Sequence, residues 1–254
     1  MIRGDKMYND VVENLSASAT KKIGLFDKSK FKYIIGSAIA GFYIGVGILI
    51  MALSMSIFSR YENGVVSLVN GFVFSCALSF VMITGGELFT GNILVMSQGA
   101  MSGSITHKKA ISACALSWIG NLLGALVLSF LFYKTHLTNI SESIVALGIK
   151  KASADFIPLV FKGIFCNILV CVAVVSCYRV KSESAKLIMI FWCILPFVAL
   201  GFEHSVANMT VFILGRLYST EITLAMAIHN LIPVTIGNVI GGLIVSIPYR
   251  ILGK

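Results

Sequence analysis

The chain has 254 residues, of which 57% are hydrophobic and only 12% are charged. Soluble domains carry about 25% charged residues, so this composition excludes a water-soluble enzyme and a disordered protein. The formal net charge of +9 belongs in the cytoplasmic loops of a membrane protein, where Lys and Arg are enriched, and does not point to a nucleic-acid partner.

The first 29 residues are polar and contain no apolar h-region, so we expect no cleavable signal peptide. Within this segment, Met7, Val11, Leu15 and Ala19 recur every four residues, which indicates a short amphipathic helix. We expect residues 1–29 to form a cytoplasmic N-terminal segment. Its helix either rests on the membrane or on the protein's own cytoplasmic face, or it gates the mouth of a pore.

Charged residues divide the rest of the chain into six long apolar segments, over 33–59, 63–107, 110–133, 156–178, 187–215 and 222–249. Because a spanning helix needs about 20 apolar residues, we predict an all-α membrane protein with six transmembrane helices. The second and fifth segments carry Glu87 and Glu203-His204 in their middle, so we expect both helices to be broken. Most Lys and Arg residues fall on one side of this arrangement, which puts both termini in the cytoplasm.

Two pairs of short segments resemble each other at a nearly constant spacing. Gly85–Thr90 resembles Gly201–Ser205, and Gly120–Gly124 resembles Gly237–Gly241. The pattern predicts two halves of three spans each, and the odd number of spans inverts the second half relative to the first. Such inverted repeats, with broken helices at matching positions, build transport sites at their interface. The alternative is that the glycines only kink two helices for packing.

This organisation gives one transmembrane channel domain over 30–254, with repeat halves at about 30–135 and 150–252. We expect non-helical backbone over Gly85–Gly91 and Gly201–Ser205, which is tolerated in a membrane only where it is buried in protein or lines a cavity. Half-helices then begin near Asn92 and near Val206, and their positive N-terminal ends can face an anion. The GxxxG pairs on the first, third and sixth spans predict close helix packing.

Polar residues at the two breaks are the candidates for function. We expect Glu87 and Glu203 to brace the breaks by accepting loop N–H groups. His204 titrates near neutral pH and lies in a break beside a carboxylate, so we assign it to the transport pathway, with Thr90 as the hydroxyl at the partner break. The intramembrane asparagines are expected to tie helices and loops together; they are Asn121, Asn167, Asn208 and Asn238.

Other chemistry is not supported by the sequence. The six cysteines lie in apolar stretches without a CxxC pair, which is typical of buried, reduced thiols. No metal-ligand spacing and no Walker A motif occurs in the sequence, so we predict neither a metal nor a cofactor.

The segments Gly85–Asn92 and Gly201–Met209 resemble the two signature loops of the formate/nitrite transporter family, and the resemblance extends over all six spans. It implies an aquaporin-like fold, a homopentamer with one pore per subunit, and location in a bacterial cytoplasmic (inner) membrane. It also implies passage of small monovalent anions, namely formate, nitrite or hydrosulfide.

The resemblance assigns roles to individual residues. His204 matches the central pore histidine and Thr90 its hydrogen-bonding partner. The remaining matches are a cytoplasmic constriction at Leu78 and Leu88 with Phe89 beside it, an outer constriction at Phe74, Val170 and Phe197, a basic residue of the outer approach at Lys151, and pore-side asparagines at Asn167 and Asn208. The first loop departs from formate channels, since it has Gly86-Glu87 in place of alanine and aspartate. That departure favours nitrite or hydrosulfide, and we expect hydrosulfide.

We therefore hypothesise a passive, pH-sensitive channel, in which His204 donates a proton so that a neutral acid crosses the next apolar constriction. One alternative is a proton-coupled formate or nitrite transporter of the same fold. A water or glycerol channel would need Asn-Pro-Ala at the breaks, which are without it. An intramembrane serine protease would need GxSG, and the nearest string, Gly99–Gly103, has alanine where the first glycine of that motif should be. We accordingly expect that the chain is not an enzyme.

Overall fold

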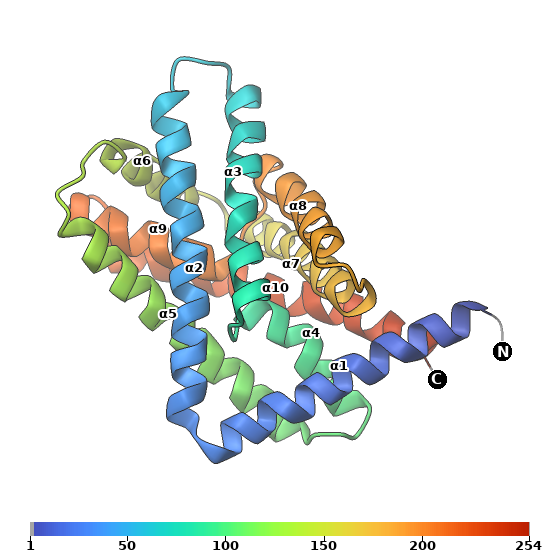
Figure 1. The fold of residues 1–254 in the computed structure, drawn as a ribbon. Helices are drawn as coiled ribbons and strands as arrows, with labels where there is room; N and C mark the ends of the chain where they lie inside the picture. The colour runs from blue at the N-terminus through green and yellow to red at the C-terminus, as the bar shows by residue number, and fades with distance from the viewer. Residues whose placement is uncertain (1–2, 254) are drawn as a thin grey trace.

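The structure is a computed structural model that describes residues 3–253; the expected domain ends at residues 1 and 254 lie outside it. Over the described range the chain folds into helices, as predicted (Figure 1). They are α1 (Arg3–Lys28), α2 (Lys30–Ile57), α3 (Asn63–Thr84), α4 (Phe89–Met101), α5 (His107–Tyr133), α6 (Ser141–Ala152), α7 (Phe156–Arg179), α8 (Glu183–Ala199), α9 (Ser205–Tyr218) and α10 (Leu224–Leu252).

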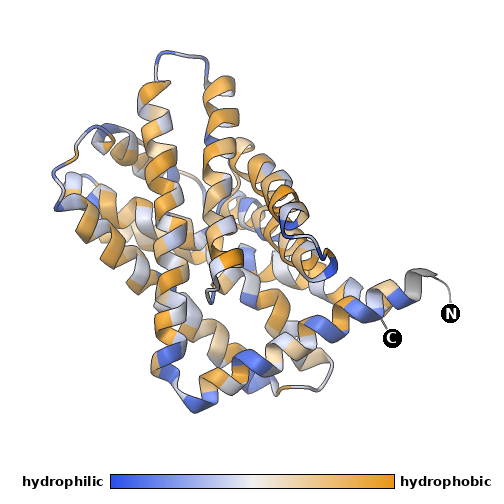
Figure 2. Cartoon of the chain, in the orientation of Figure 1, coloured by the Kyte–Doolittle hydropathy of each residue, from blue (hydrophilic) through white to orange (hydrophobic). Residues whose placement is uncertain are grey.

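Five of the described helices, α2, α3, α5, α7 and α10, are long and apolar enough to cross a membrane. These helices are hydrophobic over most of their length, and many of the hydrophilic residues lie on α1 and in the loops (Figure 2). Side chains such as Trp192 and Phe72 are about three-fifths exposed, which suits contact with lipid and not with water. The sequence predicts six spans, but α8 has 17 residues and is too short by itself.

Both predicted breaks are present. The second expected span consists of α3, which ends at Thr84, and α4; the fifth consists of α8, which ends at Ala199, and α9. Each break opens on a glycine in the left-handed region, with φ of 87° at Gly85 and 70° at Gly201, where glycine is favoured because it lacks Cβ. The half-helix expected near Asn92 begins three positions earlier, at Phe89, because a side chain from α5 holds its first N–H group.

Glycines set the close approach of two helix pairs, as the GxxxG spacing predicts. A methyl group on Gly124 would overlap the Ala38 carbonyl of α2, and one on Gly241 would overlap the Ile164 carbonyl of α7. The pair α2 and α5 and the pair α7 and α10 therefore pack backbone to backbone.

The amphipathic helix is longer than expected. The sequence predicts it over 7–19, whereas α1 covers Arg3–Lys28, because its apolar stripe continues to Ile23 and Phe26, which are buried with Val11 and Leu15. α1 lies across one end of the molecule and packs mainly on α4 (Figure 1). The C-terminal end of α10 meets it there, with the Tyr8 and Tyr249 rings 5.5 Å apart.

Candidate functional site at the two helix breaks

The first break is held by an asparagine from α5. Asn121 Oδ1 accepts the Phe89 N–H at 2.9 Å, and its Nδ2 donates to the carbonyls of Glu87 at 3.0 Å and Ser37 at 2.7 Å. The Glu87 N–H donates to the Gly36 carbonyl at 3.1 Å. The backbone of the break, which lies outside any helix, thereby gains the partners that a membrane interior does not provide.

The second break is held in the same way by α10. Asn238 Oδ1 accepts the Ser205 N–H at 2.9 Å, and its Nδ2 donates to the carbonyls of Glu203 at 3.0 Å and Gly163 at 2.9 Å. The Glu203 N–H donates to the Lys162 carbonyl at 3.2 Å. The prediction that these asparagines tie helices to loops is confirmed for Asn121 and Asn238.

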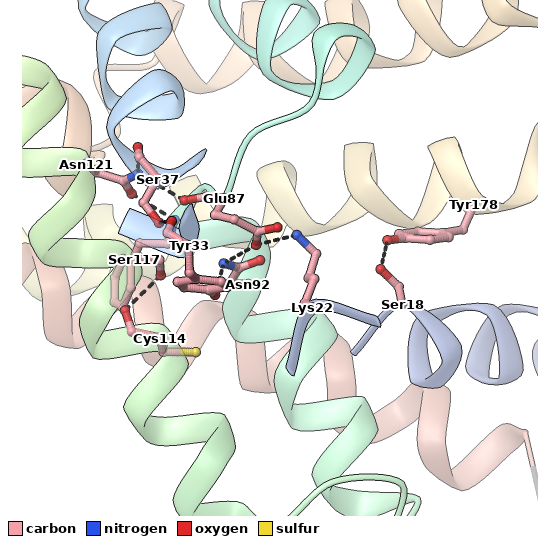
Figure 3. A network of polar contacts seen from close by, with 11 residues as sticks. Ser18, Lys22, Tyr33, Ser37, Glu87, Asn92, Cys114, Ser117, Asn121 and Tyr178 are labelled. Atoms are coloured by element: carbon pink, nitrogen blue, oxygen red, sulfur yellow. Dashed lines mark hydrogen bonds and ion pairs between the residues drawn. The ribbon is translucent and has the colours of Figure 1, made fainter. Parts of the chain in front are cut away.

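The two carboxylates also occupy matching places, but they do not accept the loop N–H groups that the sequence analysis assigned to them. Glu87 Oε2 accepts from Lys22 Nζ at 2.6 Å and from Asn92 Nδ2 at 3.0 Å (Figure 3). Because Asn121 already satisfies the loop backbone, the carboxylate is free to pair with a lysine. Glu87 therefore joins the first break to α1.

Glu203 makes the corresponding contacts at the second break. Its carboxylate accepts from Lys151 Nζ at 2.9 and 2.8 Å and from Asn208 Nδ2 at 2.6 Å. Asn208 also donates to Asn230 Oδ1 at 2.7 Å. Lys151, expected in the outer approach, is thus a half-buried ion-pair partner that joins α6 to the second break.

His204 and Thr90 meet between the two breaks, as the sequence analysis expects. His204 Nε2 lies 2.9 Å from Thr90 Oγ1, and both side chains are buried. His204 is also the N-cap of α9, since its Nδ1 accepts the Ala207 N–H at 3.2 Å. The proton of the neutral ring therefore lies on Nε2, which donates to Thr90. This leaves the Thr90 hydroxyl hydrogen free for another acceptor.

Two cavities lie near this pair, one lined by His204 and the other by Gly91, the neighbour of Thr90. The α1 vestibule has a volume of about 440 Å³ and is lined by residues that include Ser18, Lys21, Lys22, Leu78, Glu87, Leu88, Asn92 and Tyr178. The lysine vestibule has a volume of about 480 Å³ and is lined by residues that include Asn70, Phe74, Lys150, Lys151, Lys162, Phe197, Glu203, His204 and Asn208.

Most of the expected constriction residues line one of the two vestibules. Leu78 and Leu88 line the α1 vestibule. Phe74, one turn before Leu78 on α3, lines the lysine vestibule together with Phe197, and the two rings stand edge to face with centroids 5.8 Å apart. Val170 is buried in the same apolar cluster.

Two expected pore residues do not line either vestibule. Phe89 borders an apolar groove on the outer wall between α4, α5 and α10, because Asn121 fixes its backbone with the side chain turned away from the α1 vestibule. Asn167 is fully buried, and its Nδ2 donates to the carbonyls of Thr90 at 3.3 Å and Asn238 at 2.5 Å. Asn167 therefore ties the two breaks together.

Sequence reasoning missed two tyrosines that add to the contacts around the first break and α1. Tyr33 accepts from Asn92 Nδ2 at 3.1 Å, and Tyr178 donates to Ser18 of α1 at 2.7 Å (Figure 3). One signal was available, since an asparagine follows each glutamate by five residues, at Asn92 and Asn208. No signal pairs Lys22 with Glu87, because they are 65 residues apart in the sequence.

Comparison with known proteins identifies relatives over nearly the whole chain. Residues 9–251 match the profile of the family described as formate/nitrite transporter. The nitrite transporter NirC of Escherichia coli (strain K12) is 36% identical over 241 residues, which cover 93% of this chain and 88% of that protein.

Two solved structures of channels are also similar to this chain over most of its length. A structure described as an FNT family ion channel superposes with a TM-score of 0.87 at 35% identity, covering 93% of this chain and 96% of that one. A pentameric formate channel with formate bound superposes with a TM-score of 0.81 at 28% identity, covering 88% and 97%.

Proposed function

This chain belongs to the formate/nitrite transporter family, a family of multi-pass membrane transporters and channels, and on that premise we propose that it is a passive, pH-sensitive channel for small monovalent weak-acid anions. The observation that carries the proposal is the buried hydrogen bond between His204 and Thr90. His204 lines one cavity and Gly91, next to Thr90, lines the other, and both cavities are lined in part by apolar side chains.

The chemistry of the pair suits the anion of a weak acid. A bare ion loses its hydration between the apolar constrictions, and that loss is costly unless polar groups replace water. The free hydroxyl hydrogen of Thr90 and the N-terminal ends of α4 and α9 supply such groups. An anion beside the ring favours the charged form of His204, which takes up a second proton from vestibule water. The imidazolium then passes one proton to the anion and returns to its neutral form, and the resulting neutral acid crosses the next apolar constriction at little cost.

Matching contacts at the two breaks support an inverted repeat of three plus three spans. Asn121 and Asn238 hold the breaks with the same three kinds of hydrogen bond, and Glu87 and Glu203 pair with a lysine and an asparagine in the same way. We place six spans in the membrane by counting α3 with α4 and α8 with α9.

The rest of the architecture follows from the family. We propose a homopentamer with one pore per subunit, in line with the pentameric formate channel, and location in a bacterial cytoplasmic membrane, in line with the bacterial relatives. The α1 vestibule then faces the cytoplasm, and the lysine vestibule faces outward. The basic residues of α1 support this orientation.

The substrate set is nitrite, formate and hydrosulfide. The sequence analysis expects hydrosulfide because of the first loop, whereas the name of the relative that is 36% identical favours nitrite. We propose that the channel conducts nitrite. Measuring hydrosulfide flux beside nitrite flux decides whether the chain belongs to the nitrite or to the hydrosulfide branch of the family.

The test is anion flux into liposomes across a pH series for the wild type, His204→Phe and His204→Asn. We expect His204→Phe to lower nitrite flux by about 100-fold, since proton transfer by a positioned group is worth about 10²–10⁴-fold. His204→Asn keeps a hydrogen bond to Thr90 but removes the titrating group, so its flux should lose its pH dependence.

A matched control is His136→Asn. His136 lies in an exposed loop with φ of 58°, a conformation that asparagine tolerates, so this variant should conduct like the wild type. Equal rates and pH profiles in all four proteins would exclude a pore role for His204. Accumulation of nitrite against its gradient, driven by protons, would favour the alternative of a proton-coupled transporter.

A further inference from the structure

The lysine vestibule holds a charged side chain that the proposed mechanism does not use. Lys162 lies in the second turn of the membrane-spanning helix α7, is half-buried, and lines this vestibule. Among the described residues its ammonium group has no ion-pair or hydrogen-bond partner. A charge within a spanning segment is costly and is usually kept for function.

The two other half-buried lysines that line the vestibules both have carboxylate partners. Lys151 is paired with both oxygens of Glu203, at 2.9 and 2.8 Å, so the single carboxylate lining the vestibule is already used. Lys22 is paired with Glu87 in the α1 vestibule at 2.6 Å. Lys162 therefore leaves the lysine vestibule with an uncompensated positive charge close to the second break, where its own carbonyl accepts the Glu203 N–H.

A second polar side chain faces the same cavity from α3. Asn70 lines the lysine vestibule and precedes Phe74 by four residues, so it lies one helical turn above the Phe74–Phe197 pair on the same face. Its Oδ1 is buried without a hydrogen-bond partner among the residues that the structure describes. A buried amide oxygen without a partner is uncommon in folded proteins, so the Asn70 carboxamide is not used to hold the fold together.

We propose that Lys162 and Asn70 form an anion-binding station in the lysine vestibule, outside the apolar constriction, that holds a small oxyanion before it reaches His204. The inference rests on the proposed function and adds a second site to it. The ammonium group supplies the counter-charge. Asn70 Nδ2 is not among the buried atoms and has no hydrogen-bond partner among the described residues, so it is available to donate to an anion in the cavity that the side chain lines.

The chemistry of the station favours nitrite and formate over hydrosulfide. Each of these oxyanions has two oxygen atoms, so one can face the ammonium group while the other accepts the amide N–H. Hydrosulfide has a single sulfur, which satisfies the lysine but leaves the amide without an oxygen acceptor. The station therefore acts as a specificity device in addition to raising the local concentration of anions.

The experiment measures initial flux into liposomes against anion concentration, at low and at high ionic strength, for the wild type, Lys162→Met and Lys150→Met. Lys150 lines the same vestibule but is exposed, so Lys150→Met removes the same charge without removing the station. We expect Lys162→Met to raise the half-saturating nitrite concentration by about tenfold, as for loss of a hydrogen bond to a charged group, with maximal flux retained.

The salt series separates a binding station from a general field. Long-range attraction by a lysine is screened over about 8 Å at 0.15 M salt, so the effect of Lys150→Met should fade at high ionic strength while that of Lys162→Met persists. If the half-saturating nitrite concentration changed equally in both variants, or did not change in Lys162→Met, the proposed binding station would be refuted.

Asn70→Leu keeps a similar volume and provides an independent test if the lysine variant does not fold. It should raise the half-saturating concentration for nitrite and formate by about threefold or more, as for a lost hydrogen bond, and leave that for hydrosulfide unchanged. Equal changes for all three anions would contradict the amide's role. A wild type that conducts none of them would instead refute the channel function itself.

Discussion

Asn121 and Asn238 each satisfy backbone groups on both sides of a helix break. Every polar atom of the Asn121 carboxamide is used, with Oδ1 bound to the Phe89 N–H and Nδ2 bound to two carbonyls. The side chain is fully buried, so no water can take its place. The stability of the first break therefore depends on one side chain from another helix.

Asn121→Leu should lower stability by about 3 kcal/mol, because leaving a buried polar group unsatisfied costs about 1–3 kcal/mol and the Phe89 N–H and the Glu87 carbonyl both lose a partner. The measurement is the thermal unfolding midpoint in detergent, followed by size-exclusion chromatography. Asn139→Leu, in an exposed loop, is the matched control and should unfold like the wild type. An unfolding midpoint for Asn121→Leu equal to that of the control would show that the first break is stable without the hydrogen bonds of Asn121.

The residues of the site could be predicted better than their contacts. A histidine and two glutamates inside long apolar runs stand out in the sequence because charge is costly there. Which lysine pairs with which glutamate depends on the fold, and Lys151 and Glu203 are 52 residues apart. Phe89 lies next to Leu88 in the sequence, but Asn121 of another helix binds its backbone N–H. No local sequence pattern reveals that contact.

The packing of whole helices depends on glycine at a few positions, and two glycines give opposite predictions. Gly124→Ala would press a methyl group on the Ala38 carbonyl and force α2 and α5 apart, so we expect it to destabilise the protein by about 1–3 kcal/mol. Gly24 lies in α1, and a methyl group on its Cα would have nothing within 4 Å, so Gly24→Ala should stabilise the protein by about 0.5–1 kcal/mol.

Unfolding midpoints of the two variants in the same detergent test this difference. The expected order is Gly24→Ala above the wild type and Gly124→Ala below it. If Gly124→Ala also unfolded at or above the wild-type temperature, close packing of α2 on α5 would not contribute to stability.

The elements can be predicted where sequence patterns are regular. The breaks can be predicted because each interrupts an apolar segment that is too long for one helix. In the structure, a glycine at each break adopts positive φ. The helix predicted from the sequence ends too early. The apolar stripe of α1 resumes at Ile23 and Phe26, after the charged pair Lys21-Lys22. The paired lysine Lys22 is what fixes that part of α1 over the first break.

The whole molecule divides into two parts that are braced separately. The contacts of Glu87 and Asn121 all involve residues up to 121, and those of Glu203 and Asn238 all involve residues from 151 onward. Near the two breaks, the Thr90–His204 and Asn167–Thr90 hydrogen bonds join the two parts, and further contacts join them elsewhere, such as that between Tyr178 and Ser18. The sequence predicts this division from its repeated motifs, but it cannot predict which side chains join the halves.

A chain split between His136 and Leu137 should therefore reassemble. This loop is exposed, and both cut ends lie outside the two braced breaks. Co-expression of residues 1–136 and 137–254 should give a complex that copurifies and conducts nitrite at a rate within about threefold of the intact chain, because closing a short loop contributes little free energy. Failure of the fragments to copurify would mean that the halves need a continuous chain.

The separate bracing of the two breaks also has a consequence for biosynthesis. The ribosome delivers the first break to the membrane before Asn121 has been made, so its backbone stays unpaired until α5 has entered the bilayer beside α2. From then on the first half can mature while the second is still being translated. Thr90 is different, because its partner His204 is made 114 residues later. The contact between Thr90 and His204 therefore forms only after α9 has been made, and the second break is completed later still, when α10 supplies Asn238.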